Sequence, residues 1–221
     1  MRFRSGYPVE PSMPLTLACL HTAASNAPLF DAAAQALPGG ALRLTHHTRP
    51  DLLREPTPET LTEAASVLQA LAQDADAVLL TCSTIGAAAA LAQDSPCPVL
   101  RADAALAEAA TRTGALVEVL CAAPTTLAPT GAIFEAAAAR TGASIRLHLV
   151  EGAWALFLAG DIAAYHASIA AMAGTLPGRV VLAQASMAGA AALMPEAPPL
   201  TIPAIAVMAA ARAALNGRVS R

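Results

Sequence analysis

The amino-acid sequence predicts an α/β protein made of two similar halves, and three observations support this. Short apolar runs such as "AVLL" (77–80) and "RVVLA" (179–183) alternate with helical segments along the chain. Runs that are apolar at every position are typical of parallel strands covered on both faces by helices. Hydrophobic residues make up 56% of the chain and charged residues 13%, which indicates a well-buried globular protein. Finally, one strand-and-helix stretch occurs twice.

The apolar runs predict eight strands, with helices between them. The expected strands are 15–20, 41–46, 77–81, 97–100, 115–121, 145–150, 179–183 and 199–202. The expected helices are 26–36, 58–72, 84–93, 103–113, 125–140, 161–173, 187–194 and 203–216. Prolines precede the second of these helices, and Glu59 lies in its first turn, where an acidic side chain is favoured. Arg140 lies at the end of the fifth, where a cation is favoured.

The repeated stretch suggests an internal duplication. Segments 78–90 and 181–193, aligned without gaps, agree at seven of thirteen positions. Apart from alanines, the matched pairs are Val78 with Val181, Leu79 with Leu182, Ser83 with Ser186, and Gly86 with Gly189. Two such halves would bring the carboxyl ends of their strands together across a cleft, where open parallel sheets bind ligands. The alternative is a single doubly wound domain without symmetry.

The predicted boundaries place residues 15–101 plus 200–221 in the first half and residues 102–199 in the second.

Composition and charge exclude several functions. The net charge is −3 and no basic stripe is visible, so nucleic-acid binding is not expected. All 13 basic residues are arginines, so neither a lysine Schiff base to pyridoxal phosphate nor a P-loop lysine is possible. No apolar run is long enough to cross a bilayer, and "LTLACL" is too short for a signal-peptide core. We therefore expect a cytoplasmic protein with no membrane partner.

Neither the cysteines nor the histidines have the spacing of a metal site. The four cysteines are far apart and form no Cys-x-x-Cys: Cys19, Cys82, Cys97 and Cys121. His46 and His47 are adjacent, so on a strand they point to opposite faces. Cys19 and Cys121 are expected inside strands and Cys97 at the entry to one, so these three thiols are expected in the core.

The fourth cysteine, Cys82, lies where chemistry is expected. In "LLTCSTIG" (79–86) the strand ends near Thr81 and the next helix is expected to begin near Ser83 or Thr84. Free backbone N–H groups at a helix start attract anions, and the helix dipole with nearby hydroxyls favours a thiolate. The same amides could hold a substrate carboxylate while the thiolate exchanges a proton at the adjacent carbon. The alternative is that Cys82 is a small apolar filler.

Four motifs in this order and spacing resemble the aspartate/glutamate/hydantoin racemase superfamily, which includes maleate isomerases and arylmalonate decarboxylases. The motifs are "DAVLLTCSTIG", "PVLRADAALAEAA", "CAAPTTLAPT" and "VVLAQASMAG", and the resemblance covers nearly the whole chain after residue 15. It implies two pseudo-symmetric, flavodoxin-like parallel-sheet halves with the active site between them. It also implies cofactor-independent chemistry with one cysteine from each half, on opposite faces of the substrate.

The resemblance also implies roles for individual residues. Cys82 matches the catalytic cysteine of the first half. Residues implied to bind the substrate or to face the cleft are His21, Thr22, Thr81, Ser83, Thr84, Pro124, Thr125 and Thr126, with Asn26 as a weaker candidate. For each of these positions the alternative is an ordinary helix cap or turn.

The sequence departs from the family pattern at the second thiol. The second-half cysteine should fall near Gln184, whereas the ungapped repeat places Ala185 opposite Cys82. Gln184 can donate hydrogen bonds but cannot act as a base near neutral pH, and Ser186 would need activation. Gln184 and Ser186 are therefore candidate binding residues rather than replacements for the thiol.

A second departure is Arg49, where the family pattern has an acidic residue. Its guanidinium could bind a second substrate carboxylate in a bidentate manner, or it could be a solvated surface arginine.

The resulting expectation is a racemase- or isomerase-type enzyme without a cofactor, acting on the carbon α to the carboxylate of an amino acid, hydantoin or small dicarboxylic acid. A single thiol suits one-sided chemistry, as in a decarboxylase or a cis–trans isomerase. Racemisation would need a second acid, such as His21, Ser186 or a water molecule. A small-acid binding protein without activity is a further alternative. A redox thiol protein is disfavoured because no resolving cysteine is near in sequence. The expected partner is a small carboxylic acid, and the resemblance makes a homodimer plausible.

Overall fold

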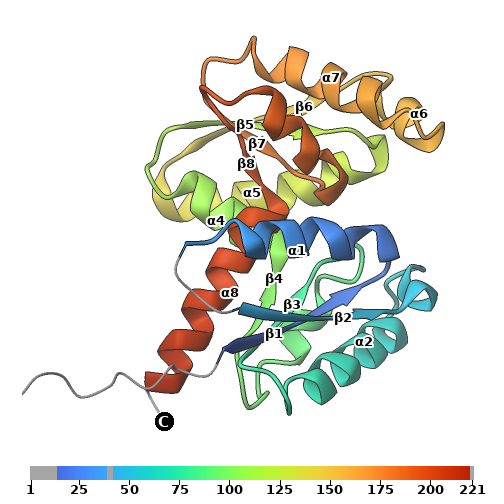
Figure 1. The fold of residues 1–221 in the computed structure, drawn as a ribbon, viewed down its shortest axis with the longest axis vertical. Coiled ribbons are helices and arrows are strands. Elements are labelled where there is room, and N and C mark those ends of the chain that lie inside the picture. The colour runs from blue at the N-terminus through green and yellow to red at the C-terminus, as the bar shows by residue number, and fades with distance from the viewer. Residues whose placement is uncertain (1–13, 39–41, 220–221) are drawn as a thin grey trace, which may run out of the picture.

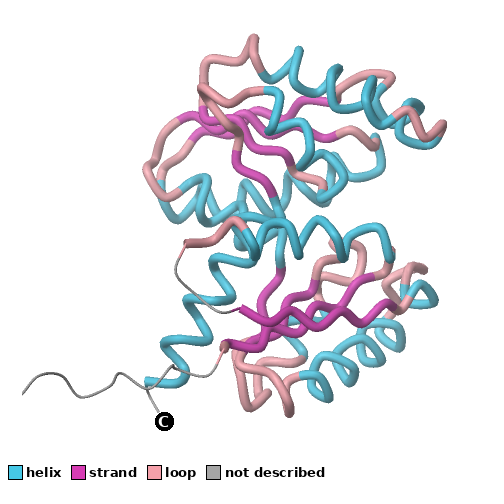
Figure 2. The backbone as a smooth tube through the Cα atoms, in the orientation of Figure 1, coloured by secondary structure: helices cyan, strands magenta, loops and turns pink. Residues whose placement is uncertain are grey.

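The computed structural model describes residues 14–38 and 42–219, which form two four-stranded sheets. The first sheet has the order β2-β1-β3-β4 and the second β6-β5-β7-β8, and every pairing is parallel. The strands are β1 (Leu15–His21), β2 (Leu42–Thr48), β3 (Ala77–Leu80), β4 (Val99–Arg101), β5 (Leu116–Cys121), β6 (Ser144–Leu149), β7 (Arg179–Leu182) and β8 (Leu200–Thr201). Figure 2 shows the two groups of strands, each flanked by helices. The matching strand order confirms the predicted α/β fold with two halves.

The helices alternate with these strands as predicted. They are α1 (Ala27–Gln35), α2 (Pro58–Leu71), α3 (Ala88–Leu91), α4 (Ala102–Thr111), α5 (Leu127–Thr141), α6 (Ala153–Leu158), α7 (Ile162–Ala173) and α8 (Ile202–Val219). Four segments are 3-10 helices: η1 (Ala24–Asn26), η2 (Pro50–Leu52), η3 (Pro124–Thr126) and η4 (Ala185–Leu193). The start of α2 follows the predicted signals, since the Thr57 hydroxyl accepts a hydrogen bond from the Thr60 N–H and Pro58 is the first helical residue.

The helix predicted at 84–93 is much shorter than expected. Only Ala88–Leu91 is helical, and residues 84–87 form a turn. Within this turn Gly86 lies directly against the Arg101 guanidinium, which an added Cβ would displace. Glycine therefore permits the close approach of this side chain.

Two other differences concern alanine-rich and apolar segments of the second half. The helix predicted at 187–194 is the 3-10 helix η4, and alanine-rich sequence does not distinguish the two hydrogen-bonding patterns. The short helix α6 was not predicted. It is bounded by Gly152 and Gly160, which have φ of 76° and 77°, so these glycines were the available signal. Position 41, where one strand was predicted to start, lies outside the described residues.

Each half contributes one helix to the other. Helix α4 follows β4 of the first sheet but packs against α5, and α8 follows β8 of the second sheet but packs against α1, β1 and β3. Figure 1 shows α8 running from the upper half down the side of the lower one. Strand β8 pairs with β7 and lies in the second sheet, whereas the prediction grouped residues 200–201 with the first half.

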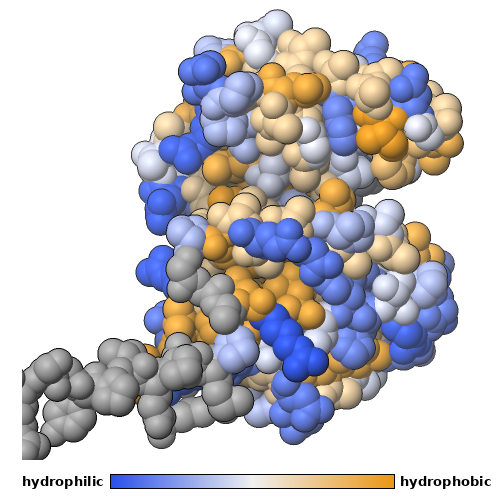
Figure 3. All heavy atoms as spheres, in the orientation of Figure 1, coloured by the Kyte–Doolittle hydropathy of each residue, from blue (hydrophilic) through white to orange (hydrophobic). Residues whose placement is uncertain are grey.

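The main core runs through both halves without interruption. It joins inner-face residues of both sheets to α4 and α8, for example Leu17, Leu79, Leu106, Val119, Val181 and Val207, all of which are fully buried. Smaller clusters lie under α2 and α3 and under α6 and α7. In Figure 3 the surface is hollowed on the right between the two halves, on the side from which α1 starts in Figure 1. Among the helices of the described residues, none combines the length and the apolar character needed to span a bilayer.

Candidate functional site

Backbone hydrogen bonds define which residues of the two halves correspond. The Thr81 N–H donates to the Leu20 carbonyl at 3.1 Å, and the Ala183 N–H donates to the Leu120 carbonyl at 3.0 Å. The residues that follow, Cys82 and Gln184, are therefore structural counterparts. The ungapped repeat, which paired Cys82 with Ala185, is wrong by one residue, and in a strand that shift exchanges the two faces.

Cys82 lies directly after β3, and its side chain is mostly buried. It is 8% exposed and packs with Leu80, Ile85 and Ala88. Because α3 begins only at Ala88, the Cys82 thiol lies beside a turn and not at a helix start. The helix dipole that was predicted to favour its thiolate is therefore not next to it.

The loop that contains Cys82 presents polar groups around the thiol. Ser83 and Thr84 are exposed. In the described part of the chain, the backbone N–H groups of residues 82, 83 and 84 have no hydrogen-bond acceptor. The loop therefore keeps the anion-binding donors that the sequence analysis expected, although they come from a turn.

Gln184 fills the corresponding position in the second half. Its Oε1 accepts hydrogen bonds from the backbone N–H groups of Ala122 (2.6 Å) and Ala123 (2.9 Å). Both alanines are buried, with exposed fractions of 1% and 3%, so the side-chain oxygen satisfies donors that water reaches poorly.

The first-half counterparts of these two alanines are Thr22 and Ala23. The correspondence follows from two equivalent backbone hydrogen bonds, each of 2.8 Å. The His21 carbonyl accepts from the Arg49 N–H in the first half, and the Cys121 carbonyl accepts from the Val150 N–H in the second. No described residue accepts a hydrogen bond from the Thr22 or Ala23 N–H. The Gln184 oxygen therefore marks, by pseudo-symmetry, where an oxygen atom of a ligand would lie next to Cys82.

Behind this loop, His21 belongs to a chain of hydrogen bonds on the inner face of the first sheet. Its Nδ1 lies 2.7 Å from the Thr81 hydroxyl and its Nε2 lies 2.8 Å from His46 Nδ1. His46 Nε2 in turn lies 3.1 Å from Asp31 Oδ1. Since the His21 ring is fully buried with both nitrogens engaged, it holds the ends of β1 and β3 together.

Burial also governs the titration of this cluster. Burial and, to a smaller extent, the neighbouring His46 lower the pKa of His21 to about 4. Burial raises the pKa of the Cys19 thiol, two residues earlier on β1, to about 12. The His21 ring and the Cys19 thiol are therefore both neutral at pH 7.

The second-half loop is partly occupied by its own contacts. The Thr126 hydroxyl donates to the Ala123 carbonyl at 2.7 Å. Pro124 and Thr125 are exposed, and the Thr125 hydroxyl has no partner among the described residues. Burial raises the pKa of the Cys121 thiol, and the nearby hydroxyls of Thr130 and Thr126 partly oppose this increase. Of this loop, Thr125 is the residue left open to a ligand.

Ser186 contacts the outer layer of the second half. Its hydroxyl lies 2.9 Å from the hydroxyl of Tyr165, which is fully buried in α7. Asn26, the weaker candidate, is half-buried at the end of η1, and its side chain caps no helix N–H.

Arg49 already has two carboxylate partners. It forms ion pairs with Asp51 and Glu63, and its side chain is 33% exposed. This arrangement favours a structural surface arginine over the binding of a second substrate carboxylate, because its charge is already neutralised.

Sequence reasoning missed His46, Asp31 and the hydrogen bonds of Gln184. The signal for His46 was the pairing of β1 with β2, which places it beside Cys19. The role of Gln184 had no such signal, because it depends on the offset between the halves.

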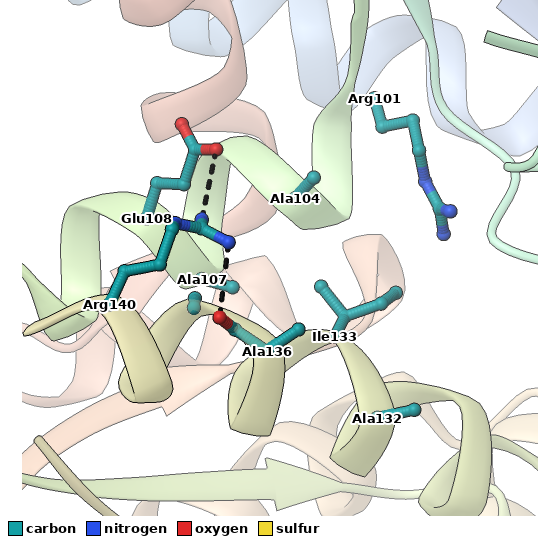
Figure 4. Close-up of a pocket in the computed structure, with 9 residues that line it drawn as sticks. Arg101, Ala104, Ala107, Glu108, Ala132, Ile133, Ala136 and Arg140 are labelled. Atoms are coloured by element: carbon teal, nitrogen blue, oxygen red, sulfur yellow. Dashed lines mark hydrogen bonds and ion pairs between the residues drawn. The ribbon is translucent and has the colours of Figure 1, made fainter. Parts of the chain in front are cut away.

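The pocket in Figure 4 lies between α4 and α5 and does not contain the residues above. It is lined mainly by alanines, with Arg140 pointing toward Glu108 and the Ala136 carbonyl, and with Arg101 at its edge. Such a surface offers little polar chemistry for a ligand.

Comparison with solved structures identifies the fold. Aspartate racemase from Picrophilus torridus is similar with a TM-score of 0.67 and 9% identity, covering 93% of this chain and 98% of that one. Allantoin racemase from Pseudomonas fluorescens has a TM-score of 0.67 at 18% identity, with 91% of each chain covered. Allantoin racemase from Klebsiella pneumoniae has a TM-score of 0.63 at 18% identity, covering 92% of this chain and 89% of that one. No protein-family model and no curated protein matches the sequence.

The fold is therefore that of the aspartate, glutamate and allantoin racemases, as the sequence motifs predicted. Within the candidate site the two halves differ, because Cys82 is a thiol and its counterpart Gln184 is an amide.

Proposed function

We propose that this protein is an enzyme of the racemase fold that moves a proton at the carbon next to a carboxylate, with Cys82 as the thiol of the site. The racemase fold supports the reaction class. The observation that carries the proposal is the pairing of Cys82 with Gln184, whose Oε1 occupies the amides of Ala122 and Ala123.

The Gln184 side chain supports a specific mode of binding. A substrate carboxylate oxygen would accept hydrogen bonds from the free N–H groups of Thr22 and Ala23, as the Gln184 oxygen does in the other half. Further donors come from the amides and hydroxyls of Ser83 and Thr84. These groups delocalise the charge that develops on the carboxylate when the adjacent carbon loses its proton, and they need no cofactor.

With one thiol, the proton is removed and returned on the same face. The Cys82 thiolate takes the α-proton, the electron pair moves into the carboxylate as an enolate, and the thiol returns a proton to the same carbon. This gives exchange with retention of configuration. Racemisation requires an acid on the opposite face, where Gln184 has no proton of suitable acidity.

The absence of a second thiol also favours a lyase as the second candidate. In a malonate-type acid one carboxylate leaves as carbon dioxide, and the Cys82 thiol protonates the resulting enolate on one face. A cis–trans isomerase, in which the thiolate adds to a double bond and is later expelled, is the remaining catalytic alternative.

The test is proton exchange in heavy water. Aspartate, glutamate and allantoin are incubated with the protein, and α-deuterium and optical purity are followed by NMR and chiral chromatography. Malonates are assayed for carbon dioxide and maleate for fumarate. We expect Cys82→Ala to lower the rate of whichever reaction the protein catalyses by at least about 100-fold, the usual effect of losing an acid–base group. The matched control Cys97→Ala, a thiol buried in the same apolar cluster, should stay within a few-fold of the unmodified protein.

The outcomes separate the alternatives. Activity that survives in Cys82→Ala contradicts the proposal, and tight binding without turnover supports a small-acid binding protein. In an active protein, Gln184→Cys should restore an acid on the opposite face and convert retention into racemisation. Retained configuration in that variant would refute the assignment of Gln184 to the opposite face.

A further inference from the structure

A second cluster, independent of the proposed reaction, lies on the inner face of the first sheet. Cys19 and His21 are two residues apart on β1 and share one face, and His46 on β2 is the register partner of Cys19. The sulfur and one ring nitrogen of each histidine lie within 4.8 Å of one another. Cys19 and His21 are fully buried, and the His46 side chain is 18% exposed, so the cluster can be reached from the His46 side.

The outer nitrogen of each ring lies beside an oxygen that can accept its proton. His46 Nε2 lies 3.1 Å from Asp31 Oδ1, and an ionised carboxylate can only accept, so this nitrogen donates. The Thr81 hydroxyl lies 3.0 Å from the Leu20 carbonyl and 2.7 Å from His21 Nδ1, so two tautomers of the neutral His21 ring fit. In one, Thr81 donates to His21 Nδ1 and His21 Nε2 donates to His46 Nδ1; in the other, Thr81 donates to Leu20 and accepts from His21 Nδ1.

In the second tautomer the two inner nitrogens, His21 Nε2 and His46 Nδ1, both carry lone pairs and face each other at 2.8 Å. Both lone pairs are then directed at one point, where a metal ion can take them as ligands. The Cys19 sulfur lies next to the same point and adds a third donor for a metal.

We propose that Cys19 Sγ, His21 Nε2 and His46 Nδ1 form a zinc-binding site. Thiolate and imidazole are the preferred zinc ligands, at about 2.3 Å for sulfur and about 2.0–2.1 Å for nitrogen. Tetrahedral bonds of that length separate two nitrogens by about 3.3 Å, so the two rings need to part by only about half an ångström. A water molecule entering from the His46 side supplies the fourth ligand.

The surrounding contacts match those of known zinc-binding histidines. A ligating histidine usually donates its other N–H to a carboxylate or another oxygen, which fixes the tautomer. Asp31 does this for His46, and Thr81 can do it for His21. On binding, the thiol of Cys19 loses its proton to solvent, the proton of the His21 ring lies on Nδ1 facing Thr81, and zinc binds the sulfur and the two free ring nitrogens.

The test uses the full chain after treatment with a chelator. Zinc binding is measured by calorimetry, and cobalt(II) is added as a spectroscopic probe. Sulfur ligation gives a near-ultraviolet charge-transfer band that zinc then abolishes. We expect one zinc per chain, a higher melting temperature, and loss of the band in Cys19→Ser. His46→Gln should weaken zinc binding at least as much as Asp31→Asn, which removes the supporting carboxylate and should cost about 10- to 100-fold.

The control variants are His47→Gln, the exposed neighbour on the opposite face, and Cys82→Ala, which removes the most exposed of the four thiols. Both should bind zinc as the unmodified protein does. Absence of zinc binding would overturn the proposal and leave the two rings joined by a hydrogen bond. A cobalt band that persists in Cys19→Ser but disappears in Cys82→Ala would place the metal elsewhere and equally overturn it.

Discussion

Replacing Gln184 tests whether its side-chain oxygen stabilises the second half. Gln184→Met keeps the length of the side chain but removes the acceptor of two buried N–H groups, those of Ala122 and Ala123. A buried donor left without an acceptor costs about 1–3 kcal/mol. Some water can reach the site beside the half-buried Gln184, so we expect a loss of about 2–4 kcal/mol in the free energy of unfolding.

Urea unfolding followed by circular dichroism measures this loss as a lower midpoint at unchanged slope. The matched control is Gln184→Glu, which keeps an oxygen in the same place and should remain within about 1 kcal/mol of the unmodified protein at pH 7. A Gln184→Met protein within about 0.5 kcal/mol of the unmodified one would refute the reasoning, because the measured loss would be far below the cost of a single orphaned donor. Equal losses in the two variants would show that the shape of the side chain matters and its oxygen does not.

Three further predictions concern other buried contacts. Gly86→Ala should displace the Arg101 guanidinium and destabilise the protein by about 1–2 kcal/mol. Thermal unfolding should show that this cost disappears when Arg101 is also replaced by alanine. Equal costs with and without the Arg101 side chain would contradict the prediction. Because the pKa of His21 is about 4 in the folded protein and about 6.5 when unfolded, stability should fall by about 3 kcal/mol as the pH drops from 6.5 to 4. Urea unfolding of the metal-free protein at several pH values measures this fall. If the free energy of unfolding of His21→Gln falls with pH as steeply as that of the unmodified protein, other groups cause the effect. His148→Leu should cost about 3 kcal/mol, because the fully buried Glu118 loses its 2.7 Å partner and keeps only the 3.5 Å ion pair with the exposed Arg146. Glu118→Leu combined with His148→Leu should recover most of the loss, and a double variant no more stable than the single one would argue against a poorly compensated buried charge.

The sequence was sufficient to predict inner strands such as β1, β3 and β5 because nearly all of their residues are buried. Runs such as 77–80 and 179–182 are apolar at nearly every position, which few other elements are, and all eight strands were found. The start of α2 was equally visible from Thr57 and Pro58. The extent of α3 was not, because the close contact between Gly86 and Arg101 is a tertiary feature.

At the candidate site, sequence reasoning identified the residue types but not their geometry. The position of Cys82 after β3 was predicted correctly, while the register of its counterpart was off by one, since alanine-rich segments match at several offsets. The prediction that no metal site exists used the spacing of residues along the chain. It did not consider that parallel pairing of β1 with β2 brings His46 to Cys19, an adjacency between residues 27 positions apart that only the sheet register reveals.

The exchange of α4 and α8 has a consequence for dissecting the protein. Because α8 follows all eight described strands and covers β1 and β3 of the first sheet, that sheet lacks its covering helix until the second half has been synthesised. A fragment ending before residue 202 would leave the apolar face of the first sheet that α8 covers open to water. A fragment containing only the second sheet would carry α4 without β4, the strand that precedes it. Expressed separately, neither fragment should be stable, and the intact chain should melt in a single cooperative step.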